Sequence, residues 1–158
     1  MMDGLADLYQ ELILDHNARP RNFGPLADAT HQAQGHNPLC GDQITIHLAL
    51  RDGTIEHVRF EGQGCAISKA SASLMTDALR GKPVAEAQTL FQAFHALLAG
   101  DDDAAASNAE ELGKLWAFSG VRGFPMRVKC ATLAWHTWQA ALKSPAAEAT
   151  PLVAICTE

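Results

Sequence analysis

The chain has 158 residues, of which 47% are hydrophobic, and this length and composition suit one domain with a substantial core. Its net charge of −6, its pI near 5.6 and the absence of a basic run argue against nucleic-acid binding. The sequence has no apolar stretch of membrane-spanning length and no leader-like start. We therefore expect a cytoplasmic protein, not bound to membranes, whose partners are proteins or small ligands.

Apolar spacing and turn residues predict helices at both ends of the chain and a β-hairpin between them. Apolar residues at helical spacing follow Asp3, which suits an N-cap, and Arg19-Pro20 should end this helix. Strict alternation marks two strands after residue 42. The expected elements are a helix over 3–19, a weak edge strand over 27–34, strands over 43–50 and 54–61, helices over 65–80 and 83–97, a solvated loop over 101–106, a helix over 107–118 with a capping box at Ser107 and Glu110 and its end at Gly120, and a helix over 125–142.

The register of the hairpin can be predicted from its apolar faces. A two-residue Asp-Gly loop would place Ile44 and Ile46 on the same face as Arg59 and Glu61, which is unfavourable. A three-residue loop with Gly53 in the left-handed conformation avoids this. The expected pairs are then Ile46–Val58, Ile44–Phe60, Asp42–Gly62 and Cys40–Gly64.

The stretch 37–42, Asn-Pro-Leu-Cys-Gly-Asp, holds a thiol and a carboxylate two residues apart, just before a predicted strand. In an extended backbone such residues point to the same side, so Cys40 and Asp42 form a bidentate pair for a small ion. Cys65, at the start of a predicted helix, and Cys130, near the start of another, could complete the ligand set. Three thiols and a carboxylate suit zinc or an iron–sulfur centre.

A cysteine considered alone is more often a small buried apolar residue than a metal ligand. The Cys-x-Asp pair and the Gly-x-Gly-Cys stretch predicted beside it favour metal ligands here. Backbone dipoles at a helix N-terminus favour the Cys65 thiolate. Zinc with these ligands would carry a formal charge of about −2, which favours nearby cations. Arg127 and Lys129 flank Cys130 and could supply them. Cys156, in the tail, is interpreted as incidental.

Several separate stretches of the chain, in the order in which they occur, resemble the U-type iron–sulfur cluster assembly proteins. Together they span almost the whole chain to about residue 142. Three features place the resemblance with the Suf-type branch: Lys129 directly before Cys130, the Gly-Phe-Pro-Met-Arg run at 123–127 and the extra stretch at 101–120. The matching segments are Leu8-Tyr9 to Asp15-His16, Pro20-Arg21-Asn22 with Gly24, Asn37-Pro38 with Cys40-Gly41-Asp42, Gly64 to Ser68, Ala70 to Ser73, Arg127 to Ala131, and Leu133-Ala134-Trp135.

The resemblance implies an α+β fold over residues 1–143, with a small antiparallel sheet of about three strands covered by about five helices. The tail over 144–158 is rich in Ala and Pro, and we expect it to be loose. The resemblance also implies a metal site on Cys40, Asp42, Cys65 and Cys130, in which zinc is bound and Cys40 accepts persulfide sulfur from a SufS-like cysteine desulfurase. Downstream iron–sulfur assembly proteins would be further partners. Whether this makes the protein an enzyme, a sulfurtransferase, stays open.

Two alternatives use the same four residues. One is a scaffold on which iron or a [2Fe-2S] cluster is assembled, with Asp42 as the weak oxygen ligand. The other is a structural zinc module that mediates protein contacts. Metal content separates the scaffold from the zinc alternatives, and persulfide transfer separates the sulfur acceptor from the structural module.

Overall fold

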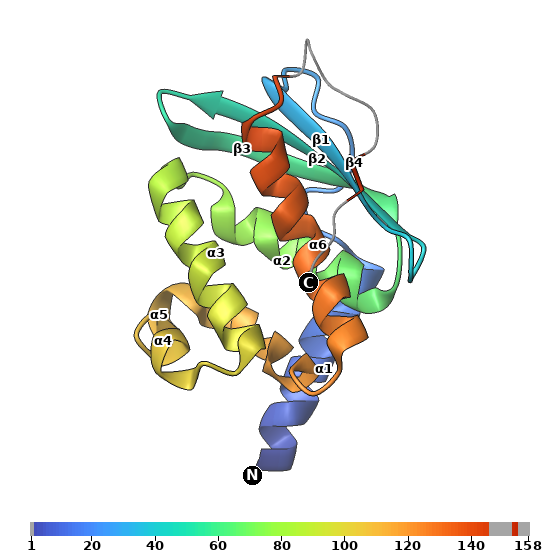
Figure 1. Ribbon diagram of the computed structural model, residues 1–158, viewed down its shortest axis with the longest axis vertical. Coiled ribbons are helices and arrows are strands. Elements are labelled where there is room, and N and C mark those ends of the chain that lie inside the picture. The colour runs from blue at the N-terminus through green and yellow to red at the C-terminus, as the bar shows by residue number, and fades with distance from the viewer. Residues whose placement is uncertain (1, 146–152, 155–158) are drawn as a thin grey trace.

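The computed structural model describes residues 2–145 and 153–154, with side chains described from residue 7 to residue 145. The expected α+β fold is confirmed, with a sheet on one side and helices packed beneath it (Figure 1). Within the described residues, no helix is long and apolar enough to cross a membrane. The elements are α1 (Met2–Ala18), β1 (His31–Asn37), β2 (Asp42–Arg51), β3 (Thr54–Gln63), α2 (Ala66–Leu79), α3 (Val84–Ala99), α4 (Asp102–Ala106), α5 (Ala109–Leu112), the 3₁₀ helix η1 (Gly113–Val121), α6 (Pro125–Leu142) and β4 (Val153–Ala154).

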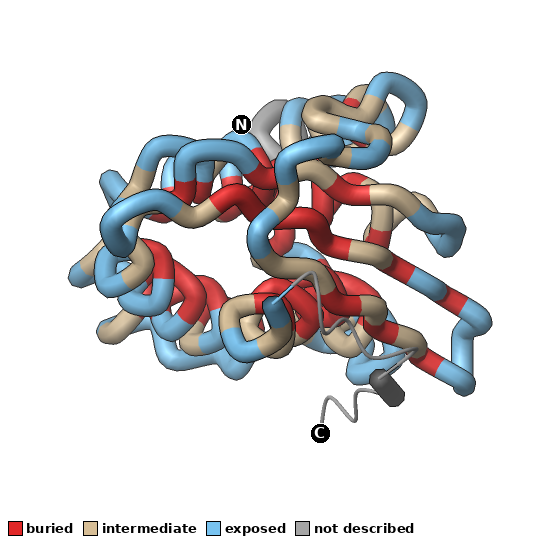
Figure 2. The backbone as a smooth tube through the Cα atoms, turned by 90° about the horizontal axis from the view of Figure 1, so that it is seen from above, coloured by how far each residue is buried: buried red, intermediate tan, exposed pale blue. Residues whose placement is uncertain are grey.

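The sheet has the strand order β3-β2-β1-β4, with β1, β2 and β3 antiparallel and β4 parallel to β1. Alternate residues of β2, Ile44, Ile46 and Leu48, are almost fully buried on the inner face. Helices α2 and α6 cover this face (Figure 1). Figure 2 shows buried positions toward the middle of the molecule and exposed positions along its periphery. Burial of these apolar side chains is the main stabilising contribution to the fold.

The hairpin register differs from the one predicted. Arg51 pairs with Thr54, so the turn is the two-residue Asp52-Gly53 loop, in which both residues have positive φ. A β-bulge then shifts the pairing, because Leu50 opposes Ile55 while Ala49 opposes His57. The extra residue keeps the apolar side chains of both strands on the inner face, which the prediction had achieved with a longer loop. The observed pairs include Leu48–Val58, Ile46–Phe60 and Ile44–Gly62.

Strand β1 was predicted only as a weak edge strand over 27–34, and the structure places it at His31–Asn37, in the interior of the sheet. Its residues are mostly Gln, His and Gly, which have no strong strand signature. Its inward positions, Ala33, Gly35 and Asn37, are small or polar. Backbone pairing with β2, rather than side-chain propensity, therefore defines this strand.

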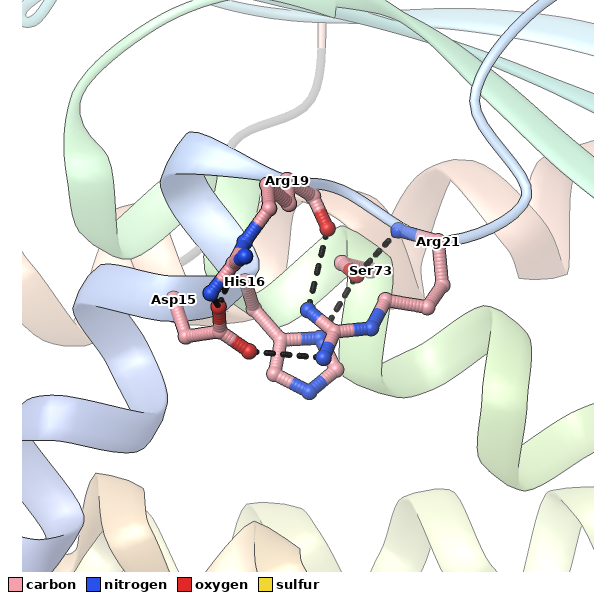
Figure 3. Close-up of polar contacts among 5 residues, drawn as sticks. All are labelled: Asp15, His16, Arg19, Arg21 and Ser73. Atoms are coloured by element: carbon pink, nitrogen blue, oxygen red, sulfur yellow. Dashed lines mark hydrogen bonds and ion pairs between the residues drawn. The ribbon is translucent and has the colours of Figure 1, made fainter.

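The C-terminal end of α1 and the residues that follow it form hydrogen bonds with α2 (Figure 3). His16 is 1% exposed, and its Nδ1 lies 2.7 Å from the Ser73 Oγ, which also accepts the Arg21 backbone N–H at 2.8 Å. Arg21 and Arg19 both form ion pairs with Asp15 at 2.6 Å. The helix ends before Pro20, as expected. At the other end it already includes Met2, so Asp3 lies inside the helix and the predicted N-cap is wrong.

Residues 101–121 depart most from the sequence prediction. The expected loop over 101–106 contains α4, whose first turn is capped because the Asp101 carboxylate accepts the Ala104 N–H. The predicted capping box is wrong, since Ser107 lies at the C-terminus of α4 and donates its hydroxyl to the Asp103 carbonyl. The expected helix over 107–118 consists of α5 and η1, and Gly120 lies inside η1.

Helices α2, α3 and α6 occupy the predicted segments. Pro125 is in the first turn of α6, where its missing N–H is tolerated. Of the tail that was expected to be loose, Val153–Ala154 pair with Gly35 and His36 of β1. The rest of that tail from residue 146 on, including Cys156, lies outside the described residues.

Candidate metal centre

The loop between β1 and β2 presents Cys40 at the surface. The Asn37 carbonyl accepts the backbone N–H groups of Cys40 and Gly41, at 3.2 and 2.9 Å. Gly41 has φ +71, a conformation that favours glycine and lets the tight turn close. Cys40 is exposed, whereas Asp42, the first residue of β2, is fully buried. The two predicted ligands therefore differ in access, because residue Cys40 is exposed and Asp42 is not.

The Asp42 carboxylate is held by the segment that joins β3 to α2. Its Oδ1 accepts the backbone N–H of Cys65 at 2.9 Å. A Cβ built on Gly64 would lie 2.5 Å from the same oxygen, so the carboxylate occupies the space that glycine leaves. Gly64 thus leaves room for the Asp42 side chain. Gly62 has another role, because a Cβ there would lie 2.0 Å from the Gln43 carbonyl oxygen of the neighbouring strand.

Cys65 is the N-cap of α2, as the sequence indicated. Its Sγ accepts the Ser68 backbone N–H at 3.4 Å. A hydrogen bond from Cys130, together with backbone N–H groups at the helix N-terminus, lowers the pKa of Cys65 to about 6. The thiolate is thus the favoured form of Cys65 at neutral pH. A thiolate is also the form of cysteine that binds metals.

Cys130, in the second turn of α6, completes the group of thiols. It is 4% exposed, and its Sγ lies 3.5 Å from the Cys40 Sγ. Its hydrogen bond to Cys65 and its burial raise the pKa of the Cys130 thiol. The ligand atoms of Cys40, Asp42 and Cys130 lie within 4.8 Å of one another, and the Cys65 Sγ is 3.9 Å from the Asp42 Oδ2.

The structure therefore brings together all four residues that the sequence singled out as ligands. They come from three segments that are far apart in the sequence. Thiol and carboxylate donors gathered at these distances fit zinc, and equally fit iron in an iron–sulfur cluster.

The two cationic residues expected near the site are placed differently. Arg127 is exposed on the first turn of α6, where its guanidinium stacks over the Phe124 ring at 4.9 Å, and it borders the groove beside the cysteines. Lys129 is partly buried and does not line that groove. Their contribution to balancing the charge of the site stays a prediction.

A groove of about 860 Å³ runs from the thiols between α1 and η1. The position of α1 beside the cysteines was not predicted from the sequence, although apolar residues outside the buried stripe of a helix can indicate such a contact surface. Leu14 is such a residue, 51% exposed, and Met126 at the opposite border is 44% exposed. Lining residues on the walls are Tyr9, Ile13 and Leu14 of α1, Ser119 and Val121 of η1, and Met126 of α6.

The fold and this arrangement of thiols agree with the comparisons to known proteins. The model of the NifU-like N-terminal domain matches residues 8–131, and the chain belongs to this family. An iron–sulfur cluster assembly scaffold protein IscU of Streptococcus pyogenes is 40% identical over 142 residues, 90% of this chain and 87% of the relative. The zinc-dependent sulfurtransferase SufU of Bacillus subtilis is 40% identical over 131 residues, 83% of this chain and 86% of the relative.

The fold is also shared with solved structures. A putative iron–sulfur cluster assembly scaffold protein for the SUF system from Fervidobacterium islandicum superposes with a TM-score of 0.75 at 33% identity, covering 84% of this chain and 94% of that one. The expected resemblance to U-type assembly proteins is thereby confirmed.

Proposed function

We propose that this protein serves iron–sulfur cluster assembly by accepting sulfane sulfur from a cysteine desulfurase on Cys40. The observation that carries the proposal is the exposed Cys40 thiol at the mouth of a groove, 3.5 Å from the buried Cys130 thiol and within reach of the buried Asp42 carboxylate. The similarity to a zinc-dependent sulfurtransferase supports it. Cytoplasmic localisation and partnership with a SufS-like desulfurase belong to the same proposal.

In this proposal Cys40, Asp42, Cys65 and Cys130 hold a zinc ion. Bound zinc would keep the cysteine ligands deprotonated and would favour one fixed arrangement of the three segments. The residues present suit that role, since Cys65 already favours the thiolate and Asp42 is held by a backbone N–H.

Sulfur transfer requires a thiolate that can reach the partner's persulfide. The Cys40 thiolate attacks the terminal sulfur, a new S–S bond forms on Cys40, and the old S–S bond breaks with the partner's cysteine leaving as a thiolate. No oxidant or reductant is consumed. Among the three cysteines whose side chains are described, Cys40 and Cys65 are exposed and Cys130 is buried. Cys40 is better suited to this attack than Cys65, because it lies on a loop while the Cys65 Sγ is engaged as the cap of α2.

The groove offers the route by which the partner's cysteine would arrive. A persulfide carried on a protein must reach Cys40 on an extended segment, and an apolar groove that leads to the thiol would bind such a segment. Its borders expose Leu14 and Met126, side chains that a docked segment would bury.

A second candidate is a scaffold on which a cluster is built, with iron or [2Fe-2S] on the same four residues. The mixed donor set favours it, because one carboxylate among three thiols is a weak point from which a cluster can leave. Two of the similar proteins carry scaffold names. A purely structural zinc module has less support, since it does not need an exposed ligand that opens on a groove.

The experiment combines metal analysis with a desulfurase assay. Protein purified without added metal should contain about one zinc per chain, and it should increase sulfide release by the desulfurase. Cys40→Ala should abolish that stimulation while some zinc remains, because Asp42, Cys65 and Cys130 can still bind it. Full stimulation by Cys40→Ala would overturn the acceptor role. Iron and labile sulfide in place of zinc would favour the scaffold.

A further inference from the structure

Asn37, at the end of β1, lies directly beside the candidate metal centre. It is 4% exposed and pairs across the ladder with Asp42. Residues directly opposite each other in an antiparallel pair project on the same face, with Cβ atoms about 4.5–5.5 Å apart. Asn37 therefore shares the inner face with the Asp42 carboxylate, under helix α6, which carries Cys130 and packs on β1.

The oxygen atoms of Asn37 are occupied by the Cys40 loop. The side-chain Oδ1 accepts the Leu39 N–H at 3.2 Å, and the main-chain carbonyl accepts the N–H groups of Cys40 and Gly41. The bond from the Leu39 N–H explains why position 37 has a side chain with a short, accepting oxygen, as asparagine and aspartate do. These hydrogen bonds do not involve the amide nitrogen.

The Asn37 Nδ2 is buried and has no hydrogen-bond partner among the residues that the structure describes. A buried amide NH₂ group without a partner is costly, so native proteins rarely retain one without a reason. The adjacent ligand set would become strongly anionic on binding zinc, and an anionic ligand atom is a strong acceptor for a neutral N–H.

We propose that Asn37 is a positioning residue whose Nδ2–H donates to an anionic ligand atom of the zinc-loaded site, while its oxygens hold the Cys40 loop. This inference rests on the zinc centre of the proposed function. The donor would offset part of the negative charge of the site from inside the sheet, where solvent cannot. Hydrogen bonds of this kind to metal ligands typically change metal affinity by about 10–100-fold.

The test is Asn37→Ser, because the serine hydroxyl can still accept the Leu39 N–H but the amide donor is lost. Zinc affinity is measured by competition with a chelator, and thermal stability is measured on the zinc-free protein. We expect zinc affinity to fall by about tenfold or more, and the zinc-free melting temperature to stay unchanged or rise, because an unpaired buried donor has been removed. Asn108→Ser, in the distant α4–α5 turn, is the control and should leave zinc affinity unchanged.

A role confined to holding the loop predicts a different result. Zinc affinity within twofold of the parent, or a loss that merely follows a lower stability of the zinc-free chain, would overturn the inference. If Asn37→Ser does not fold, Asn37→Asp keeps the side-chain shape and the loop acceptor, and it should bind zinc at least tenfold more weakly. Unchanged affinity in that variant would also overturn the inference. A parent chain that binds no zinc would instead overturn the metal centre itself.

Discussion

At the scale of single residues, Gly64 controls where the Asp42 carboxylate can lie. Its backbone does not need a positive φ, so alanine is allowed by the chain, but the added Cβ would approach the Asp42 Oδ1 to 2.5 Å. We predict that Gly64→Ala turns the carboxylate away from the thiols and weakens zinc binding about tenfold. Chelator competition measures this. Gly123→Ala, which has open space around it, is the control, and equal affinities in both variants would refute the steric account.

The four candidate ligands could be predicted from the sequence because their chemistry is local. Cys40 and Asp42 are two residues apart, and Cys65 follows a glycine at the start of a clear helix pattern. Asn37 could not be predicted as part of the site. Its partner across the ladder depends on β1, whose polar, glycine-containing sequence gives no strong strand signal.

At the scale of elements, two exposed leucines lie among the side chains of α1 that the structure describes, and they differ in one respect. Leu14 lines the groove, whereas Leu8 is exposed but does not line it. If the groove binds the desulfurase, Leu14→Asp should weaken that complex by about tenfold or more, because a charge would be buried in an apolar contact. Leu8→Asp is the matched control. Binding measured by titration calorimetry should separate the two variants, and equal effects would exclude the groove as the docking site.

The attachment of α1 should depend on pH through His16. Burial, reinforced by the positive charge of Arg21, lowers the pKa of His16 below its usual value near 6.5. The unfolded chain therefore binds the proton more readily than the folded chain, and stability is lost as the pH falls below about 6.5. His16→Asn keeps a polar group near the Ser73 Oγ and removes the titration.

Thermal melts between pH 7 and pH 5 check this prediction. The parent chain should lose more stability on acidification than His16→Asn. Part of the dependence should remain in the variant, because burial also lowers the pKa of His136. Identical pH profiles for the two proteins would show that His16 does not titrate as described.

The types of the long elements were predictable, whereas their junctions and the short elements of residues 101–121 were not. The helices α2, α3 and α6 follow clear apolar spacing. The hairpin register failed because a bulge opposite Leu50 restores the apolar face that a two-residue turn alone would lose, and such a compensation is invisible to pattern matching. In residues 101–121, α4 replaces the expected loop, because Asp101 caps its first turn, and α5 with η1 replaces the expected single helix.

At the scale of the whole molecule, the candidate metal centre joins the β1–β2 loop, the N-terminus of α2 and the second turn of α6. Zinc bound there would stabilise only the folded chain. At free zinc about 1,000 times the dissociation constant, the melting temperature should rise by about 10 °C relative to chelator-treated protein. Equal melting temperatures with zinc and with chelator would contradict a zinc site at this junction.

The central claim, that Cys40 accepts the sulfur, is tested most directly by locating the sulfane sulfur itself. Cleavage after lysine and arginine places the four cysteines on four different peptides, spanning residues 22–51, 60–69, 130–143 and 144–158. After reaction with the desulfurase and cysteine, then trapping without reductant, mass spectrometry should find one added sulfur, about 32 Da, on peptide 22–51. The same increment found only on the peptides of Cys65, Cys130 or Cys156 would contradict the assignment of Cys40.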